Sequence, residues 1–238
     1  MEKESPRTSL LYWFPRIKHL DIPMPETHIL LVNRSIIMAA MYEHLPLSLE
    51  LIDELHATAA KVGYPLFLRT DLQSGKHGWI RTCFVKDDVH LLDNLFGVAE
   101  ENDLGACSFG PDYEAFVFRK FLELETAFIA FYGQMPINKE RRYFIENGEV
   151  VCHHPYWPEE AFLEHTDEGG WQEKLAELNY EHDEIEQLTA YAKQVSAALP
   201  GYWSVDFARA KDGKWYLIYM ALGIESFHWE GCPHAQNG

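Results

Sequence analysis

The chain has 238 residues, 47% of them hydrophobic and 14% aromatic, which is enough to bury a substantial core in one large domain or two closely packed lobes. The formal net charge of −17 repels phosphate backbones and anionic lipid surfaces, so it argues against nucleic acid as a partner. No stretch approaches the roughly 20 apolar residues of a membrane span, and residues 1–7 lack the apolar core of a signal peptide. We expect a globular, cytoplasmic protein without a membrane segment.

The cysteines are dispersed and form no CxxC pair: Cys83, Cys107, Cys152 and Cys232. This pattern favours reduced thiols over a disulfide framework or a zinc site. His228, Cys232 and His234 lie close together in sequence, but their spacing matches no zinc pattern. We therefore expect these histidines to be structural or exposed to solvent.

The first half of the chain mixes strands and helices. Residues 28–33 predict a short buried strand, and an apolar stripe predicts a helix over 46–62. Strands are expected at 66–70 and 79–85, on either side of a loop rich in glycine and serine. A helix over about 88–101 follows.

The second half predicts strands joined by tight turns, with two helices before the final hairpin. The strands are expected at 116–122, 128–132, 142–146 and 149–153. The second helix is expected over about 181–198, where apolar residues recur at helical spacing. The whole pattern indicates an α+β fold.

A β-hairpin is predicted over 203–223, because Asp212-Gly213 suits a two-residue type I′ turn between two runs of strand-forming residues. Counting outward from this turn gives three pairs of residues that share a face. They are Ala208 with Leu217, Asp206 with Tyr219, and Ser204 with Ala221.

Asn147-Gly148 predicts a second hairpin of the same kind. The same counting pairs Tyr143 with Cys152 and Arg142 with His153. Arg142 could then reach a phosphate group. The alternative is a solvated cluster of charges on a hairpin.

The segment from Pro65 to Trp79 places Arg69 at the end of a strand, before a loop with Ser74, Gly75 and Lys76. The NH groups of such a loop can converge on phosphate oxygens, while the cations neutralise charge. It is not a P-loop, because GxxxxGK[ST] is absent and a strand follows. The alternative is a plain flexible loop, since glycine and serine are ordinary turn residues.

These motifs, taken in order, resemble the ATP-grasp superfamily over about 65–232. The segments that carry the resemblance are Phe67–Asp71 with Ser74–His77, Phe118–Leu124, Glu140–Phe144 with Asn147–Glu149, and Trp203–Asp206 with Asp212–Trp215. The resemblance implies two α+β lobes that clamp a nucleotide between antiparallel sheets. It divides the chain into an N-terminal α/β segment (1–62), a small lobe with the phosphate loop (63–115) and a larger lobe with the hinge and the last hairpin (116–238).

The resemblance also implies ATP and magnesium as ligands and assigns roles to residues. Arg142 would contact the terminal phosphate and stabilise charge during transfer, as the catalytic residue, and Asp206 would bind magnesium. The nucleotide would be held by a phosphate-binding set and a hinge that meets adenine and ribose mainly through main-chain groups. These residues are Arg69, Ser74, Gly75 and Lys76 for the phosphates, and Phe118, Arg119, Lys120, Phe121 and Glu123 for the hinge.

Three positions depart from the family pattern. Tyr219 and Ala221 stand where a second acidic ligand and an asparagine are expected, and Lys120 replaces an acidic residue of the hinge. Tyr219 could donate its hydroxyl to Asp206 instead, and Glu225 could supply the missing carboxylate. Asp206 could also be an ordinary surface residue of the hairpin.

Three hypotheses about function follow. The first is an ATP-dependent ligase that activates a small-molecule or peptide carboxylate by phosphoryl transfer from Mg-ATP. The second is a non-catalytic ATP-grasp-like module that binds a nucleotide or a protein partner. The third is an unrelated α+β protein that shares only the architecture.

Overall fold

The structure is a computed structural model, which describes residues 6–76, 78–105, 111–131, 135–163, 166, 168–180 and 184–235. The chain divides into two compact units: Met1–Met24 with Glu123–Gly238 (unit 1), and Pro25–Leu122 (unit 2). The sequence placed its boundaries at 62/63 and 115/116 instead. Residues 25–62 join unit 2 because β1 (Thr27–Leu31) pairs along its whole length with β4 (Ala115–Lys120).

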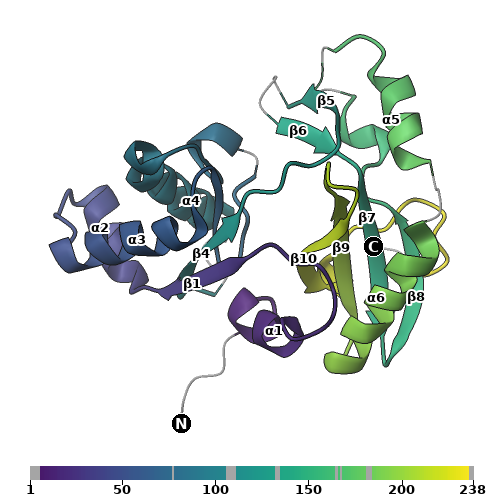
Figure 1. Ribbon diagram of the computed structural model, residues 1–238, viewed down its shortest axis with the longest axis horizontal. Helices are drawn as coiled ribbons and strands as arrows, with labels where there is room; N and C mark the ends of the chain where they lie inside the picture. The colour runs from purple at the N-terminus through teal and green to yellow at the C-terminus, as the bar shows by residue number, and fades with distance from the viewer. Residues whose placement is uncertain are drawn as a thin grey trace. The chain divides into compact units, whose positions relative to one another are not determined.

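Unit 2 is an antiparallel sheet with helices packed against it (Figure 1). The strand order is β1-β4-β2-β3, with β2 at Leu66–Thr70 and β3 at Phe84–Val85. Helices α2 (Arg34–Tyr42), α3 (Leu49–Val62) and α4 (Leu91–Gly105) share a hydrophobic core with one face of the sheet. That core includes Leu55, Leu68, Leu95 and Phe118, so the side chains of Phe67, Arg69 and Arg119 lie on the opposite face.

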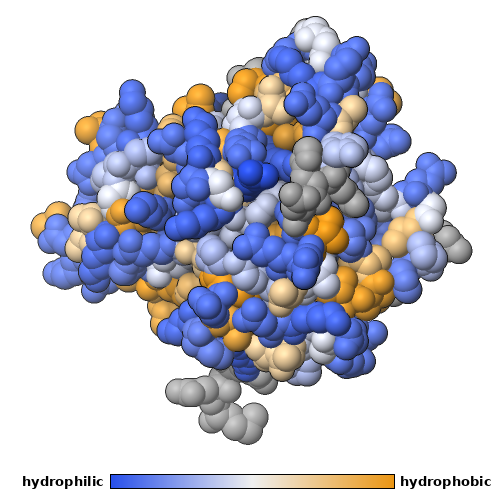
Figure 2. Space-filling view, turned by 45° about the vertical axis from the view of Figure 1, so that its right-hand side comes forward, coloured by the Kyte–Doolittle hydropathy of each residue, from blue (hydrophilic) through white to orange (hydrophobic). Residues whose placement is uncertain are grey.

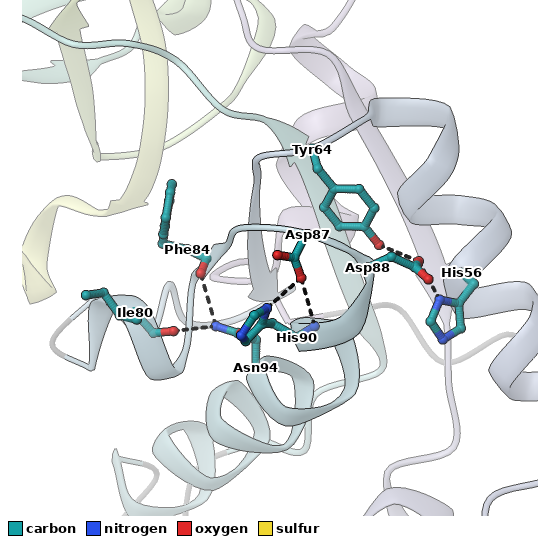
Figure 3. A network of polar contacts seen from close by, with 8 residues as sticks. All are labelled: His56, Tyr64, Ile80, Phe84, Asp87, Asp88, His90 and Asn94. Atoms are coloured by element: carbon teal, nitrogen blue, oxygen red, sulfur yellow. Dashed lines mark hydrogen bonds and ion pairs between the residues drawn. The ribbon is translucent and has the colours of Figure 1, made fainter.

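The strand predicted over 79–85 is wrong except at its end, because residues 79–81 form a 3₁₀ turn (Trp79–Arg81) and only Phe84 and Val85 are extended. Trp79 has a left-handed φ of 36°, which breaks the extended chain. The buried amide of Asn94 on α4 donates to the carbonyls of Ile80 at 2.9 Å, Thr82 at 2.7 Å and Phe84 at 3.1 Å. Figure 3 shows this amide reaching the Ile80 and Phe84 carbonyls. The turn is therefore held by α4.

A 3₁₀ turn, Asp88–His90, leads into α4 and is tied to α3 (Figure 3). Asp87 caps the turn by accepting from the His90 backbone NH. Asp88 accepts from Tyr64 at 3.1 Å and lies 2.7 Å from Nδ1 of His56. These contacts are exposed and organise the connection between β3 and α4.

Unit 1 contains a second antiparallel sheet, in the order β10-β9-β7-β8. Its strands are β7 (Glu140–Glu146), β8 (Glu149–Pro155), β9 (Trp203–Arg209) and β10 (Trp215–Leu222). Helix α6 (Glu184–Ala198) covers the face that carries Tyr143 and Phe207, where the Tyr143 hydroxyl donates to the Ile185 carbonyl at 3.5 Å. Helix α1 (Leu10–Ile17), which the sequence did not predict, belongs to this unit through the stacking of Tyr12 on Trp203.

A smaller part of unit 1 is built on the pair β5 (Thr126–Ala130) and β6 (Met135–Asn138). Helix α5 (Trp171–Asn179) and the 3₁₀ turn Glu159–Ala161 complete it. Aromatic side chains dominate its core, among them Phe128, Trp157, Phe162 and Trp171. The sequence missed β6, which is only four residues long.

The last hairpin confirms two of the three predicted pairs and corrects the third. Asp206 lies opposite Tyr219 and Ser204 opposite Ala221, but Ala208 faces Tyr216 rather than Leu217. The turn is one residue longer than predicted, because Ala210 and Lys214 are hydrogen bonded across Lys211–Gly213. A bulge between Leu217 and Tyr219 then restores the counted register.

The Asn147-Gly148 turn forms as predicted, with φ of 51° and 87° at its two residues. The predicted pairs beyond it are wrong, because a bulge between Phe144 and Ile145 moves the register by one residue. Tyr143 pairs with His153, and Arg142 with His154.

The surface agrees with the strongly acidic composition. On the face drawn in Figure 2, hydrophilic residues predominate and hydrophobic ones form small separate areas. Among the described residues, no helix has the length and apolar character that crossing a membrane requires.

Candidate functional site

Four side chains lie in one row across the sheet of unit 1. His154 on β8 faces Arg142 on β7, Arg142 faces Asp206 on β9, and Asp206 faces Tyr219 on β10. Residues directly opposite each other share a face, so the whole row lies on the face opposite to α6. The sheet thus brings both predicted site residues of this unit, Arg142 and Asp206, into contact.

Arg142 and Asp206 form a buried, two-pronged ion pair. Nε of Arg142 donates to Oδ1 of Asp206 at 2.8 Å, and Nη2 donates to Oδ2, also at 2.8 Å. The two residues are 9% and 1% exposed, so the pair is shielded from water. Burial opposes the charge of Arg142, but the charge and hydrogen bonds of Asp206 outweigh it and raise the pKa of Arg142. Asp206 is therefore not an ordinary surface residue of the hairpin.

Two further residues surround this pair. The guanidinium carbon of Arg142 lies 4.5 Å from the ring centre of Tyr156, a cation–π distance. His154 is buried, and its Nδ1 lies 2.7 Å from the Pro155 carbonyl. Burial lowers the pKa of His154 to about 4, opposed by that carbonyl and reinforced by the charge of Arg142. Its Nε2 has no hydrogen-bond partner among the described residues, so the neutral ring offers a nitrogen to this face.

Glu140 adds a carboxylate that the sequence analysis did not select. It lies two residues before Arg142 on β7, so both side chains are on the same face, and it pairs with Ala208, two residues after Asp206. Glu140 is 7% exposed. Alternation along β7 was the signal that could have found it. The face therefore holds two buried carboxylates, from Asp206 and Glu140.

The neighbouring Arg141 has a different role, because it points to the other face. Its guanidinium lies 3.0 Å from Glu184 on α6 and donates to the Asn179 and Tyr180 carbonyls. Lys139 joins the same carboxylate at 3.6 Å. This buried cluster attaches β7 to α6 and leaves Arg142 as the cation of the opposite face.

In unit 2, two predicted cations are buried on the same face of the sheet. Arg69 and Arg119 are 1% and 4% exposed, and Phe67, two residues before Arg69, pairs with Arg119. Nε of Arg69 donates to the Thr70 carbonyl at 2.8 Å, and Nε of Arg119 to the Thr27 hydroxyl at 3.2 Å. Burial and then the charge of Arg69 lower the pKa of Arg119 to about 9. Two buried like charges are electrostatically unfavourable, and an anion bound beside them would relieve this.

The predicted phosphate loop follows β2 and is tied to the segment before β3. Gly75 is buried with a left-handed φ of 59°, and its carbonyl accepts a hydrogen bond from the Thr82 hydroxyl. Ser74 and Lys76 are partly exposed. His77 lies outside the described residues. The loop is thus partly ordered by its own contacts and keeps two polar side chains accessible.

The predicted hinge residues differ in environment. Phe118 is in the hydrophobic core of unit 2, so only its main chain could contact a ligand. Lys120 is exposed, and its NH donates to the Glu26 carbonyl at 2.8 Å. Phe121 packs edge-on against Phe84, with ring centres 5.0 Å apart. In unit 1, Glu123 is exposed and lies 3.5 Å from the Lys211 ammonium.

Comparison with known proteins identifies one family and a consistent fold. Residues 54–226 match the model of a family described as an ATP-grasp domain, the third family of its clade. No match was found among curated proteins.

Two solved structures illustrate the likeness in fold. Cdc123 from Schizosaccharomyces pombe superposes with a TM-score of 0.58 and 10% identity, over 91% of this chain and 83% of that one. The N5-carboxyaminoimidazole synthase of Aspergillus clavatus, in complex with ADP and 5-aminoimidazole ribonucleotide, gives a TM-score of 0.51 and 14% identity, over 90% of this chain and 43% of that one. At these identities the likeness shows the fold alone.

Proposed function

Because the chain belongs to the ATP-grasp domain family whose model it matches, we propose that it binds ATP with magnesium and transfers the terminal phosphoryl group to a carboxylate. The observation that carries the proposal, beyond the family itself, is the buried pair Arg69 and Arg119, whose like charges favour a bound anion. Family membership removes the hypothesis of an unrelated α+β protein. An acyl phosphate formed in this way would then be attacked by an amine or another nucleophile.

The phosphate-binding residues are assigned to unit 2. Arg69 and Arg119 would neutralise phosphate charge, and Lys76 would add a partly exposed cation from the loop. Ser74 and Gly75 would contribute loop NH groups. The hinge residues 118–123 would meet the base mainly through their main chain, which agrees with the burial of the Phe118 side chain.

The metal-binding residues are assigned to unit 1. Asp206 and Glu140 provide carboxylate oxygens on one face of the sheet, the donor type that magnesium prefers. Magnesium, when bound, would bridge phosphate oxygens and offset their negative charge. Glu140 would then supply the second carboxylate that Tyr219 and Ala221 cannot provide.

Arg142 would act as a charge-stabilising residue. Its guanidinium has further donors besides the Nε and Nη2 groups that bind Asp206. Arg142 could therefore keep Asp206 oriented and also stabilise charge on a transferring phosphoryl group. The substrate in this proposal is a small-molecule or peptide carboxylate, and the setting is the cytoplasm, where thiols remain reduced.

A second candidate function is a non-catalytic module that binds a nucleotide or a protein partner. It is favoured by the same ion pair, since both Asp206 oxygens accept from Arg142 and are engaged without any metal. Tyr219 lies directly across from Asp206, and the hydrogen bond predicted between them stays a prediction. Glu225, the other carboxylate considered, is exposed in the 3₁₀ turn Gly223–Glu225.

Thermal-shift titration separates these functions. We expect ATP to raise the melting temperature, and to do so more with magnesium than with EDTA if the protein is an enzyme. Stabilisation that does not depend on metal would favour the non-catalytic module. Absence of any shift with ATP under both conditions would reject both nucleotide-binding functions.

Variants test the assignment of the phosphate site. Lys76→Ala and Arg69→Ala should weaken ATP binding without unfolding the protein, whereas Lys61→Ala, an exposed lysine of α3, should leave it unchanged. Unchanged affinity in both Lys76→Ala and Arg69→Ala would remove the assignment. Glu140→Gln should reduce the contribution of magnesium and leave the binding seen in EDTA.

A further inference from the structure

Three potential metal ligands meet at one end of the sheet in unit 1. Cys152 lies on β8 opposite Phe144, while His228 and Cys232 follow the 3₁₀ turn Gly223–Glu225. One ligand atom from each of these residues lies within 4.8 Å of the other two. Sγ of Cys152 is 3.8 Å from Nδ1 of His228. The sequence analysis did not expect this cluster, because Cys152 is 76 residues before His228.

We propose that Cys152, His228 and Cys232 form a zinc-binding site. Two thiolates and an imidazole are typical zinc ligands, and soft thiolates disfavour magnesium and calcium. With Zn–S near 2.3 Å and Zn–N near 2.0 Å, tetrahedral geometry separates ligand atoms by about 3.5–3.8 Å. The observed Cys152–His228 distance of 3.8 Å is close to this range.

The surroundings of His228 already orient its ring for such a site. Nε2 lies 2.9 Å from the Tyr202 hydroxyl, which leaves Nδ1 directed toward Cys152. The ring also stacks on Phe144, with centres 3.6 Å apart and planes at 17°. A hydrogen bond from the second ring nitrogen is the usual support of a metal-binding histidine. Burial, followed by the charges of His234 and Arg142, lowers the pKa of His228, which favours the neutral form that binds metal.

Three protein ligands leave the fourth position to water or to His234, two residues after Cys232. Binding would release the thiol protons, so affinity should fall as the pH falls. Burial and then the neighbouring Cys232 raise the pKa of Cys152 to about 12, so its proton is displaced by the metal rather than lost beforehand. The bound ion would attach the C-terminal segment to β8, on the face that carries Arg142.

Cobalt substitution tests the site on the full chain. Purified, reduced protein is titrated with Co²⁺, and we expect about one equivalent to bind with a thiolate-to-cobalt charge-transfer band, which Zn²⁺ then removes. Cys152→Ser and Cys232→Ser should each weaken that band, and His228→Asn should lower metal affinity. Cys83→Ser, which changes a buried cysteine of unit 2, is the matched control and should retain the band.

Tyr202→Phe supplies a graded test, since it removes only the hydroxyl beside His228. Metal affinity should fall about 10- to 100-fold. The wild-type titration needs no variant to fold, and a chain that binds Co²⁺ without a thiolate band would overturn the proposal. So would a band unchanged in both Cys152→Ser and Cys232→Ser. A Cys152–Cys232 disulfide, seen as an intact mass lower by two hydrogens, together with no metal binding after reduction, would likewise overturn it.

Discussion

At the scale of single residues, the chemistry of unit 1 centres on charges that are removed from water. Arg142 and Asp206 compensate each other, with Tyr156 packed against the guanidinium. A buried pair of this kind adds little net stability, but removing one partner leaves an uncompensated charge. Residue-level predictions therefore concern the loss of one member of a buried set.

Asp206→Asn should destabilise the protein by about 3 kcal/mol, because Arg142 would keep its charge in a buried position. Urea unfolding measures the change in free energy. Glu225→Gln makes the same acid-to-amide change at an exposed position and should have almost no effect. A loss no larger than that of the control would show that the ion pair is not maintained in solution.

His154 predicts a dependence of stability on pH. The unfolded ring takes up a proton near pH 6.5, whereas the folded ring takes it up only near pH 4. The unfolded state therefore binds more protons in this window, so the free energy of unfolding should fall by about 2 kcal/mol as the pH drops through it. Urea midpoints across this range should be less steep in His154→Gln and unchanged in slope in His19→Gln, at an exposed position. Equal slopes in His154→Gln and wild type would contradict the assignment.

At the scale of elements, β7 has a different role on each face. Its odd-numbered residues Arg141 and Tyr143 contact α6, while Glu140 and Arg142 lie on the opposite face. The buried carboxylate of Glu184 receives Arg141 at 3.0 Å and Lys139 at 3.6 Å. The strand and the helix are thus joined by charge as well as by apolar packing.

Glu184→Ala should cost about 3 kcal/mol and open the first turn of α6, since two buried cations lose their partner. Hydrogen exchange followed by mass spectrometry should show faster exchange at the start of α6 and in β7. Glu186→Ala, in the same turn but exposed, should leave this exchange unchanged. Acceleration spread evenly over both units would instead indicate a general loss of stability.

At the scale of the whole molecule, acidity and local cationic sites coexist. The formal net charge is −17, yet Arg69 and Arg119 are buried together on one sheet face of unit 2. Long-range repulsion acts on extended polyanions, whereas a small anion responds to the local cations.

ATP should therefore stabilise the protein, by about 2.7 kcal/mol at a concentration 100 times its Kd. Single-stranded DNA at the same phosphate concentration should give no shift in melting temperature. Stabilisation by DNA that weakens steeply with salt would show that the basic residues serve a nucleic acid instead.

Local rules were sufficient for much of the fold and for part of the site. The Asn147-Gly148 turn, the pair of Asp206 with Tyr219 and the resemblance to ATP-grasp proteins all followed from short motifs in order. The predicted strand over 79–85 failed because a buried side chain of α4, Asn94, binds the backbone of that segment. A contact of this kind lies outside any local pattern.

From sequence alone came the α+β class, the family and the face-by-face order of the strands near their turns, because turn chemistry and side-chain alternation act over a few residues. Tertiary structure alone decided the bulges that set Arg142 opposite His154 and the ion pair between Arg142 and Asp206. It also decided the approach of Cys152 to His228. These contacts join distant segments, and packing of the sheet and its C-terminal segment determines which side chains meet.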